Sequence, residues 1–145
     1  MNILGIFATL LLIAVAATAV LYFARPAMLF RWLTAALRRF ARVRRKTIEV
    51  DGIAWPYLEG GPPEGEVLLL VHGFGAEKDH WLAYARQFSK KYRVVIPDVP
   101  GFGEATKSAD LDYGMAAQAQ RLDGFLQALG VPRCHAAGNS MGGYI

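Results

Sequence analysis

The chain has 145 residues, 54% of them hydrophobic and 12% aromatic, and its 16 basic and 12 acidic side chains give a formal net charge of +4. This length accommodates about one domain, and the composition excludes a disordered, collagen-like or disulfide-framework protein. Cys134 is the only cysteine, so an intramolecular disulfide is excluded, and the sequence shows no cysteine and histidine spacing typical of a metal site. The folded part is compatible with a reducing compartment.

The positive charge is concentrated near the N-terminus. Residues 1–46 hold eight basic side chains and no acidic one, whereas residues 47–145 hold eight basic and twelve acidic ones, a net charge of −4. Because the basic stretch directly follows an apolar segment, it indicates contact with anionic lipid headgroups and argues against a nucleic-acid partner.

The apolar segment runs from Ile3 to Ala24 and contains no charged residue. As a helix, its 22 residues would rise ~33 Å, enough to cross a hydrocarbon core of ~30 Å. Residues 1–24 are therefore predicted to form a single transmembrane anchor. The alternative is a cleaved signal peptide, since residues 17–19 (ATA) resemble a cleavage site, but the run is longer than the usual ~7–15 residues and no Lys or Arg precedes it.

Residues 25–46 are interpreted as a basic, amphipathic juxtamembrane segment. Apolar residues recur there at steps of three and four, with basic residues on the other side, which is typical of a helix lying at a membrane surface. A solvated basic linker is the alternative. Since all these charges follow the apolar span, the positive-inside rule predicts a cytoplasmic main domain.

Short apolar runs and helical patterns alternate in the rest of the chain. Apolar runs bounded by turn residues predict buried strands, and stretches with helical spacing separate them. This alternation predicts an α/β fold with a parallel sheet. The strands are expected at residues 67–71, 94–97 and 133–137, and the helices at residues 79–92, with Asp79 as N-cap, and 114–130.

A hairpin is predicted before this alternation, at residues 47–60. Because Pro56 has no N–H to donate, we expect the second strand of the hairpin to be an edge strand or to contain a bulge.

The segment GNSMGG at residues 138–143 follows the last predicted strand and precedes a helical pattern. It fits the G-x-S-x-G pattern, in which a serine lies on a strained strand-to-helix turn that needs small neighbours, as Gly138 and Gly142 are. Ser140 is therefore predicted to be a nucleophile at the carboxyl end of the sheet, where the positive end of the next helix helps to stabilise an oxyanion. A glycine-rich turn without catalytic meaning is the alternative.

Two more loops follow the earlier predicted strands. In the first loop, His72-Gly73-Phe74-Gly75, the N–H of Phe74 could pair with the N–H of Met141 to form an oxyanion hole. His72 is interpreted as a structural histidine that braces this loop. Asp98 in the second loop, DVPGFG at residues 98–103, is interpreted as a loop-bracing carboxylate.

These three elements, in this order and spacing, resemble the α/β-hydrolase superfamily. The stretch HGFGAEKDHW at residues 72–81, together with residues 138–143, is similar to bacterial lipases of the Moraxella type and to membrane-anchored monoacylglycerol lipases. The resemblance covers residues 47–145 and implies the N-terminal portion of an α/β-hydrolase sheet, with no metal or organic cofactor. The site residues that it implies are Ser140 as the nucleophile, Phe74 and Met141 as oxyanion donors, and His72, Gly73, Gly138 and Gly142 as supporting positions.

One part of the family's machinery has no counterpart in the sequence. The catalytic acid and histidine follow the serine in the order of this superfamily, but only residues 141–145 follow Ser140. His72, His80 and His135 each have a better structural explanation. Residues 47–145 are therefore expected to be the N-terminal part of a longer domain, with an unpaired sheet edge, and the 145-residue chain by itself is expected to be inactive.

The function implied for the complete protein is hydrolysis of carboxylic esters through an acyl-enzyme, as in a lipase or esterase. A membrane anchor suits a substrate dissolved in lipid, such as a monoacylglycerol or another acyl ester, and places the protein in a bacterial inner membrane. Two alternatives stay open. GNSMGG is also typical of C–C hydrolases that cleave meta-cleavage products, and the chain could be a non-catalytic, membrane-tethered fragment.

Overall fold

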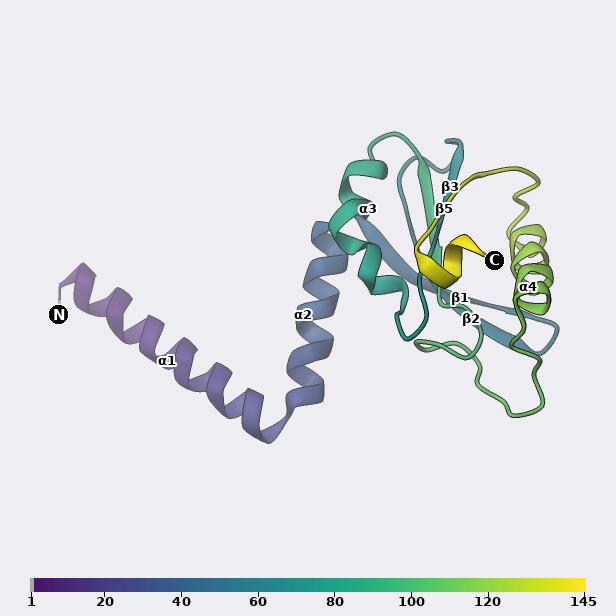
Figure 1. Ribbon diagram of the computed structural model, residues 1–145. Coiled ribbons are helices and arrows are strands. Elements are labelled where there is room, and N and C mark those ends of the chain that lie inside the picture. The colour runs from purple at the N-terminus through teal and green to yellow at the C-terminus, as the bar shows by residue number, and fades with distance from the viewer. Residues whose placement is uncertain (1) are drawn as a thin grey trace. The chain divides into compact units, whose positions relative to one another are not determined.

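The computed structural model describes residues 2–145, which divide into two compact units with a boundary between Leu37 and Arg38. The first unit begins with helix α1 (Ile3–Ala24), which coincides with the uncharged run (Figure 1). The side chain of Asn2 accepts a hydrogen bond from the N–H of Gly5 and so caps this helix. No residue of α1 is buried, and its length and apolar composition make it a candidate membrane span.

Helix α2 (Pro26–Phe40) is shorter than the predicted juxtamembrane segment. Arg42 has a φ of 60°, in the left-handed region, which ends the helical path. Residues 43–46, expected in the amphipathic segment, instead belong to the first strand, because Val43 is buried in the core and pairs with Gly60. The amphipathic helix therefore ends six residues before the predicted boundary at Lys46.

Five strands form one mixed sheet in the order β1-β2-β4-β3-β5. The predicted hairpin is present, and its turn residues Asp51 and Gly52 both have positive φ, as a two-residue type I′ turn requires. β2 and β4 are antiparallel, whereas β3 runs parallel to both β4 and β5, as predicted. The strands are β1 (Val43–Val50), β2 (Ile53–Gly60), β3 (Val67–Val71), β4 (Arg93–Pro97) and β5 (His135–Gly138), of which β5 ends the sheet and is exposed.

The prediction that Pro56 confines its strand to an edge or a bulge is wrong, because β2 lies between β1 and β4. Pro56 pairs in register with Thr47 of β1, but the ladder with β4 begins only at Tyr57. The proline thus precedes that ladder, and its carbonyl accepts a hydrogen bond from the N–H of Asp98 at 2.8 Å. An interior strand tolerates proline here because the β4 ladder needs no donor from it.

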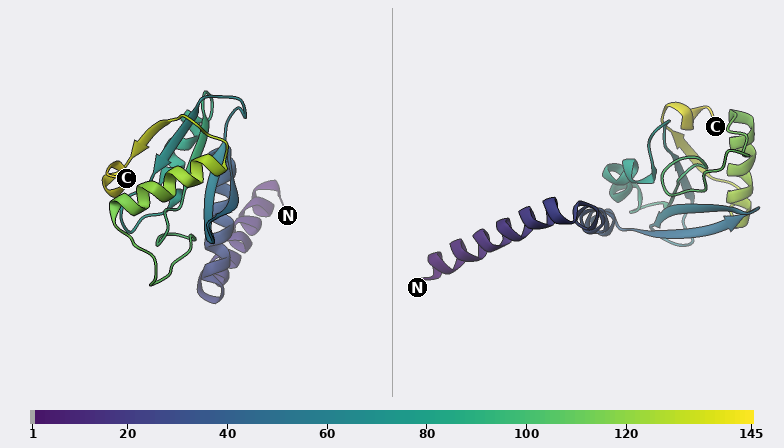
Figure 2. Two further views of the ribbon diagram at one scale, coloured as in Figure 1. Left: turned by 90° about the vertical axis from the view of Figure 1, so that its right-hand side faces the viewer. Right: turned by 90° about the horizontal axis from the view of Figure 1, so that it is seen from below.

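Helices cover the two faces of the sheet (Figures 1 and 2). Alternate residues of β3 point to opposite faces, so Leu69 packs in a core with Phe125 of α4 (Met115–Ala128), and Leu70 packs in a core with Ala85 of α3 (Leu82–Phe88). A 3₁₀ turn at Lys78–Trp81 precedes α3. The predicted N-cap is therefore wrong: Glu77 is the N-cap of the 3₁₀ turn and Trp81 that of α3, and the carboxylate of Asp79 binds Arg38 instead.

Candidate active site

The turn that follows β5 places Ser140 at the carboxyl end of the sheet. The N–H of Asn139 donates to the carbonyl of Val71 at 3.0 Å, which joins the ends of β5 and β3. Ser140 comes next, with a φ of 49°, and opens a 3₁₀ turn over Ser140–Gly143. A non-glycine residue in the left-handed region is uncommon and strained, and such strain is concentrated at functional sites.

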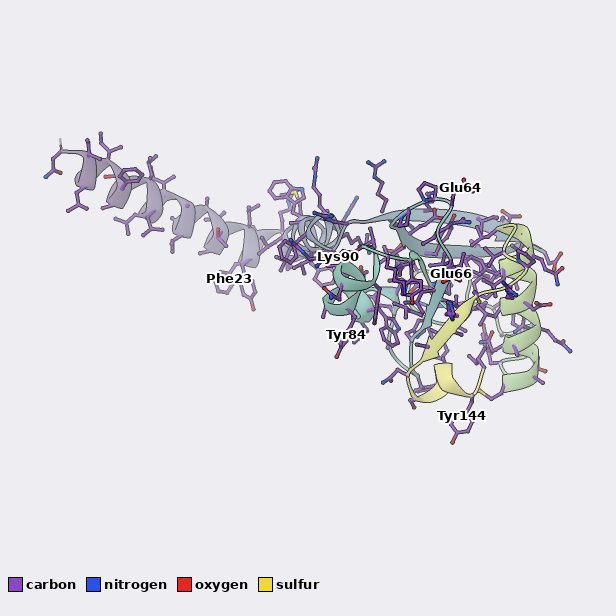
Figure 3. The ribbon with its side chains drawn as sticks, turned by 90° about the horizontal axis from the view of Figure 1, so that it is seen from above. Phe23, Glu64, Glu66, Tyr84, Lys90 and Tyr144 are labelled. Atoms are coloured by element: carbon purple, nitrogen blue, oxygen red, sulfur yellow. The ribbon has the colours of Figure 1, made fainter. Side chains whose placement is uncertain are left out.

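The glycines around Ser140 allow this turn to form. A Cβ at Gly138 would overlap the carbonyl of Gly142, and a Cβ at Gly142 would overlap the carbonyl of Val71. Neither position can take a side chain without moving backbone, which is the physical reason for small residues on both sides of the serine. Beyond the turn, Tyr144 points away from the fold (Figure 3).

The loop that follows β3 lies against the same turn. A Cβ at Gly73 would lie 2.8 Å from the Oδ1 of Asn139 and 3.5 Å from the Cβ of Ser140, so close approach requires glycine here too. Among the residues that the structure describes, no acceptor engages the N–H of Phe74 or of Met141. The side chain of Phe74 is 81% exposed, with its ring 5.3 Å from that of Phe102.

His72 is buried and uses both ring nitrogens within the protein. Its Nε2 accepts a hydrogen bond from the N–H of Val99 at 3.0 Å, so the proton is assigned to Nδ1, which donates to the carbonyl of Gly73 at 2.8 Å. Burial lowers the pKa of His72, although its hydrogen bond to Gly73 and the charge of Asp98 oppose this shift. His72 is therefore a neutral structural residue that ties the loop after β3 to the loop after β4.

Asp98 is fully buried and also braces these two loops. Its carboxylate accepts hydrogen bonds from the N–H of Lys78 at 2.7 Å, from the Nζ of Lys78 at 2.7 Å and from the N–H of Glu104 at 2.9 Å. A Cβ at Gly103, which has a φ of 51°, would overlap this carboxylate. The bracing role interpreted from the sequence thus agrees with these contacts, and Lys78 is the cation that pairs with the carboxylate. A buried acid needs a cation, but nothing local in the sequence indicates which lysine supplies it.

A pocket of about 190 Å³ adjoins the two loops, lined by His72, Gly73, Ala76, His80, Trp81, Tyr84 and Asn139. Within residues 2–145, the Nε1 of Trp81 is buried without a hydrogen-bond partner. A larger hollow is lined by residues that include Glu64, Glu66 and His135, which precede or begin β3 and β5, whereas Tyr144 follows the other end of β5. Glu64 and Tyr144 lie far apart in Figure 3. The smaller pocket is therefore the one that belongs to the candidate site.

The other histidines have separate contacts. The Nδ1 of His80 accepts a hydrogen bond from the N–H of Glu77 at 3.2 Å, and His135 lies 3.5 Å from the carboxylate of Glu66. Neither is hydrogen-bonded to Ser140 in the part of the chain that the structure describes. No group of three or more His, Cys, Asp or Glu side chains in residues 2–145 could hold a metal ion.

Comparison with known proteins gives consistent matches. The family described as alpha/beta hydrolase fold matches residues 66–145. Lipase 1 of Psychrobacter immobilis is 49% identical over 90 residues, which are 61% of this chain and 28% of that protein. Monoacylglycerol lipase abhd6-A of Xenopus laevis is 31% identical over 83% of this chain and 36% of that protein.

The solved structures include a similar fold. The crystal structure of a membrane phospholipase A, described as a novel bacterial virulence factor, superposes with a TM-score of 0.81 at 45% identity, covering 96% of this chain and 44% of that one. The matched segments thus span less than half of each of these three relatives. Together with the strand order and the turn at Ser140, these matches show that the chain belongs to the α/β-hydrolase family and that its relatives include lipases.

Proposed function

We propose that the complete protein is a serine hydrolase that cleaves carboxylic esters of lipids, with Ser140 as its nucleophile. The observation that carries this proposal is the left-handed backbone of Ser140 at the end of β5, between two glycines that cannot take a side chain. This geometry presents the hydroxyl at the carboxyl edge of the sheet beside the loop of Phe74.

The chemistry follows from these groups. The Oγ of Ser140 attacks the acyl carbon, and the N–H groups of Phe74 and Met141 hold the negative charge that develops on the carbonyl oxygen. A histidine takes the serine proton and returns it to the departing alcohol, leaving an acyl-enzyme that water then hydrolyses. We propose that this histidine and its acid lie beyond Ile145, since the matched relatives extend much further than this chain and both nitrogens of His72 are already used.

The proposed substrate class is an acyl ester held in a membrane. A lipase, a monoacylglycerol lipase and a membrane phospholipase A are among the similar proteins, and α1 is long and apolar enough to span a bilayer. We propose that residues 1–24 anchor the protein, that residues 47–145 belong to the hydrolase domain, and that the basic residues after α1 keep this domain in the cytoplasm.

The test uses the full-length gene product in native membranes, labelled with a fluorophosphonate probe that reacts with activated serines. Ser140→Ala should abolish labelling and reduce monoacylglycerol hydrolysis to the uncatalysed background, because removing a nucleophile of this kind costs on the order of 10⁶-fold in kcat. Ser108→Ala, which changes a half-buried serine in a loop outside the candidate site, should leave both unchanged.

Two results would contradict the proposal. Labelling retained in Ser140→Ala would reject the nucleophile. Turnover of a dienoate diketone together with failure to cleave acyl esters would replace ester hydrolysis by C–C bond hydrolysis at the same serine.

A further inference from the structure

We propose that Arg38 is a positioning residue for the oxyanion loop, residues 73–77, and acts on it through a charge network. This inference rests on the proposed function. The charge network comprises three cations and three carboxylates, namely Arg38, Arg45, Lys78, Asp79, Asp98 and Glu104.

The inner part of the network is the ion pair between Lys78 and Asp98. Both side chains are fully buried, with 2.7 Å between the Nζ and the carboxylate, and the backbone N–H of Lys78 binds the other carboxylate oxygen. The backbone N–H of Glu104 binds this carboxylate as well. A buried pair with this many hydrogen bonds has one favourable geometry, so it fixes the backbone of Lys78 relative to the loop after β4.

The outer part of the network comes from the N-terminal basic stretch. Arg38, in the last turn of α2, donates two hydrogen bonds to the two oxygens of Asp79, at 2.7 and 2.5 Å. Both side chains are largely buried, with exposed fractions of 16% and 14%. Bidentate pairing of this kind fixes orientation as well as distance. Since Asp79 follows Lys78 directly, Arg38 holds the 3₁₀ turn that begins at Lys78.

Glu104 connects the two parts. Its carboxylate accepts a hydrogen bond from the Nε of Arg45 at 2.6 Å and lies 3.6 Å from the Nζ of Lys78 and 4.0 Å from Arg38. Burial would raise the pKa of Glu104, but the hydrogen bond from Arg45 and the three nearby cations outweigh it and lower the pKa. Glu104 therefore stays ionised at neutral pH and completes the network.

The oxyanion loop is consequently held at both ends. His72 is bound to Val99 on one side, and Lys78 is bound to Asp98 on the other. The intervening backbone is closed by one turn, in which the N–H of Ala76 donates to the carbonyl of Gly73 at 3.2 Å. An oxyanion donor is effective when it needs no reorganisation during the reaction. Loosening the end at Lys78 should therefore impair transition-state stabilisation more than substrate binding.

The experiment compares Arg38→Gln with Arg39→Gln in the full-length gene product, solubilised in detergent and assayed with a water-soluble acyl ester. Arg39 is an exposed neighbour in the same helix and has no ion-pair partner in the described residues, so it controls for loss of charge. Arg38→Gln should lower kcat about tenfold with KM nearly unchanged, less than the roughly 10²–10³-fold cost of removing an oxyanion donor. Arg38→Lys should restore activity only in part, because lysine cannot form the bidentate pair.

Hydrogen exchange gives a readout that does not depend on catalysis. Backbone amides of residues 73–80 should exchange faster in Arg38→Gln, whereas those of α4 should not change, which shows that the fold is retained. Equal kcat in Arg38→Gln and Arg39→Gln, or unchanged exchange in residues 73–80, would overturn the positioning role. Absence of fluorophosphonate labelling in the wild-type protein would instead overturn the proposed function.

Discussion

The two ring nitrogens of His72 are committed to opposite roles. Nε2 accepts from Val99 and Nδ1 donates to Gly73, so the imidazole is held as one neutral tautomer. A proton added to Nε2 would place two N–H groups against each other. Burial also disfavours the protonated ring and lowers its pKa. The residue that links the two loops of the candidate site is therefore also sensitive to acid.

This arrangement predicts an acid-dependent loss of stability. Because the pKa of His72 is lower in the folded state, the unfolded state binds more protons below about pH 6.5, and stability falls as the pH decreases from there. Between pH 7.5 and 5.5, urea unfolding should show a smaller loss in His72→Leu than in the wild type, by up to about 1.4 kcal/mol for each pH unit below 6.5. His135→Gln, which changes an exposed histidine, is the control. An equal pH dependence in His72→Leu would contradict the prediction.

Helix α4 packs Leu122 and Phe125 into the core on its face of the sheet. The ring of Phe125 is stacked on Trp55 at 4.8 Å and meets Tyr57 edge to face at 5.5 Å. Both partners are on β2, so α4 packs across strands that precede it in the chain. This contact holds the hairpin and the parallel strands in one layer.

Phe125→Ala should therefore lower the free energy of unfolding by about 3–5 kcal/mol, since it removes a buried aromatic ring and leaves a cavity. Urea unfolding followed by tryptophan fluorescence measures this directly, because Trp55 is the stacked partner. Gln127→Ala on the exposed side of α4 should change stability by less than about 0.5 kcal/mol. A loss below 1 kcal/mol for Phe125→Ala would mean that the helix is not essential to this core.

Most elements were predictable because their signals are local. Continuous apolar runs bounded by turn residues indicate the strands at 67–71 and 94–97, and the segment at residues 47–60 indicates the hairpin. The end of α2, the interior position of β2 and the N-cap before α3 were not predictable from such patterns. Each depends on a contact with a partner that is distant in sequence. Val43 pairs with Gly60, the strand of Pro56 pairs with β4, and Asp79 binds Arg38.

In the candidate site, too, local features could be predicted from the sequence and contacts between distant residues could not. The strained turn at Ser140 and the need for glycine at Gly138 and Gly142 followed from adjacent residues. The ion pair of Lys78 and Asp98 did not, because 20 residues separate its members. Sequence reasoning thus located the backbone of the site but not the charge network behind it.

At the scale of the whole molecule, the length and composition of α1 predict that the protein is anchored in a membrane. If residues 3–24 span a bilayer, the full-length gene product should remain in the membrane pellet after a carbonate wash, with the apolar run still present by mass spectrometry. Ile13→Arg, near the middle of this run, should reduce insertion, since arginine at the centre of a span costs about 2.5–3.5 kcal/mol. Ile13→Leu is the matched control. Release of the wild-type protein, or a mature chain without residues 3–24, would identify a signal peptide instead.

The strand order β1-β2-β4-β3-β5 has a consequence for where a ligand can enter. The chain leaves β3 for its neighbour on one side, β4, and then crosses back to its neighbour on the other side, β5. The connection after β3 carries α3 to one face of the sheet and the connection after β4 carries α4 to the other, and such a topological switch point opens a crevice at the carboxyl ends of the strands. Gly73 of the loop after β3 and Asn139 of the turn after β5 both line the pocket at this edge, and the chain connectivity is what brings these two loops together. Residues in the two loops can therefore change what is bound while the sheet beneath them stays the same.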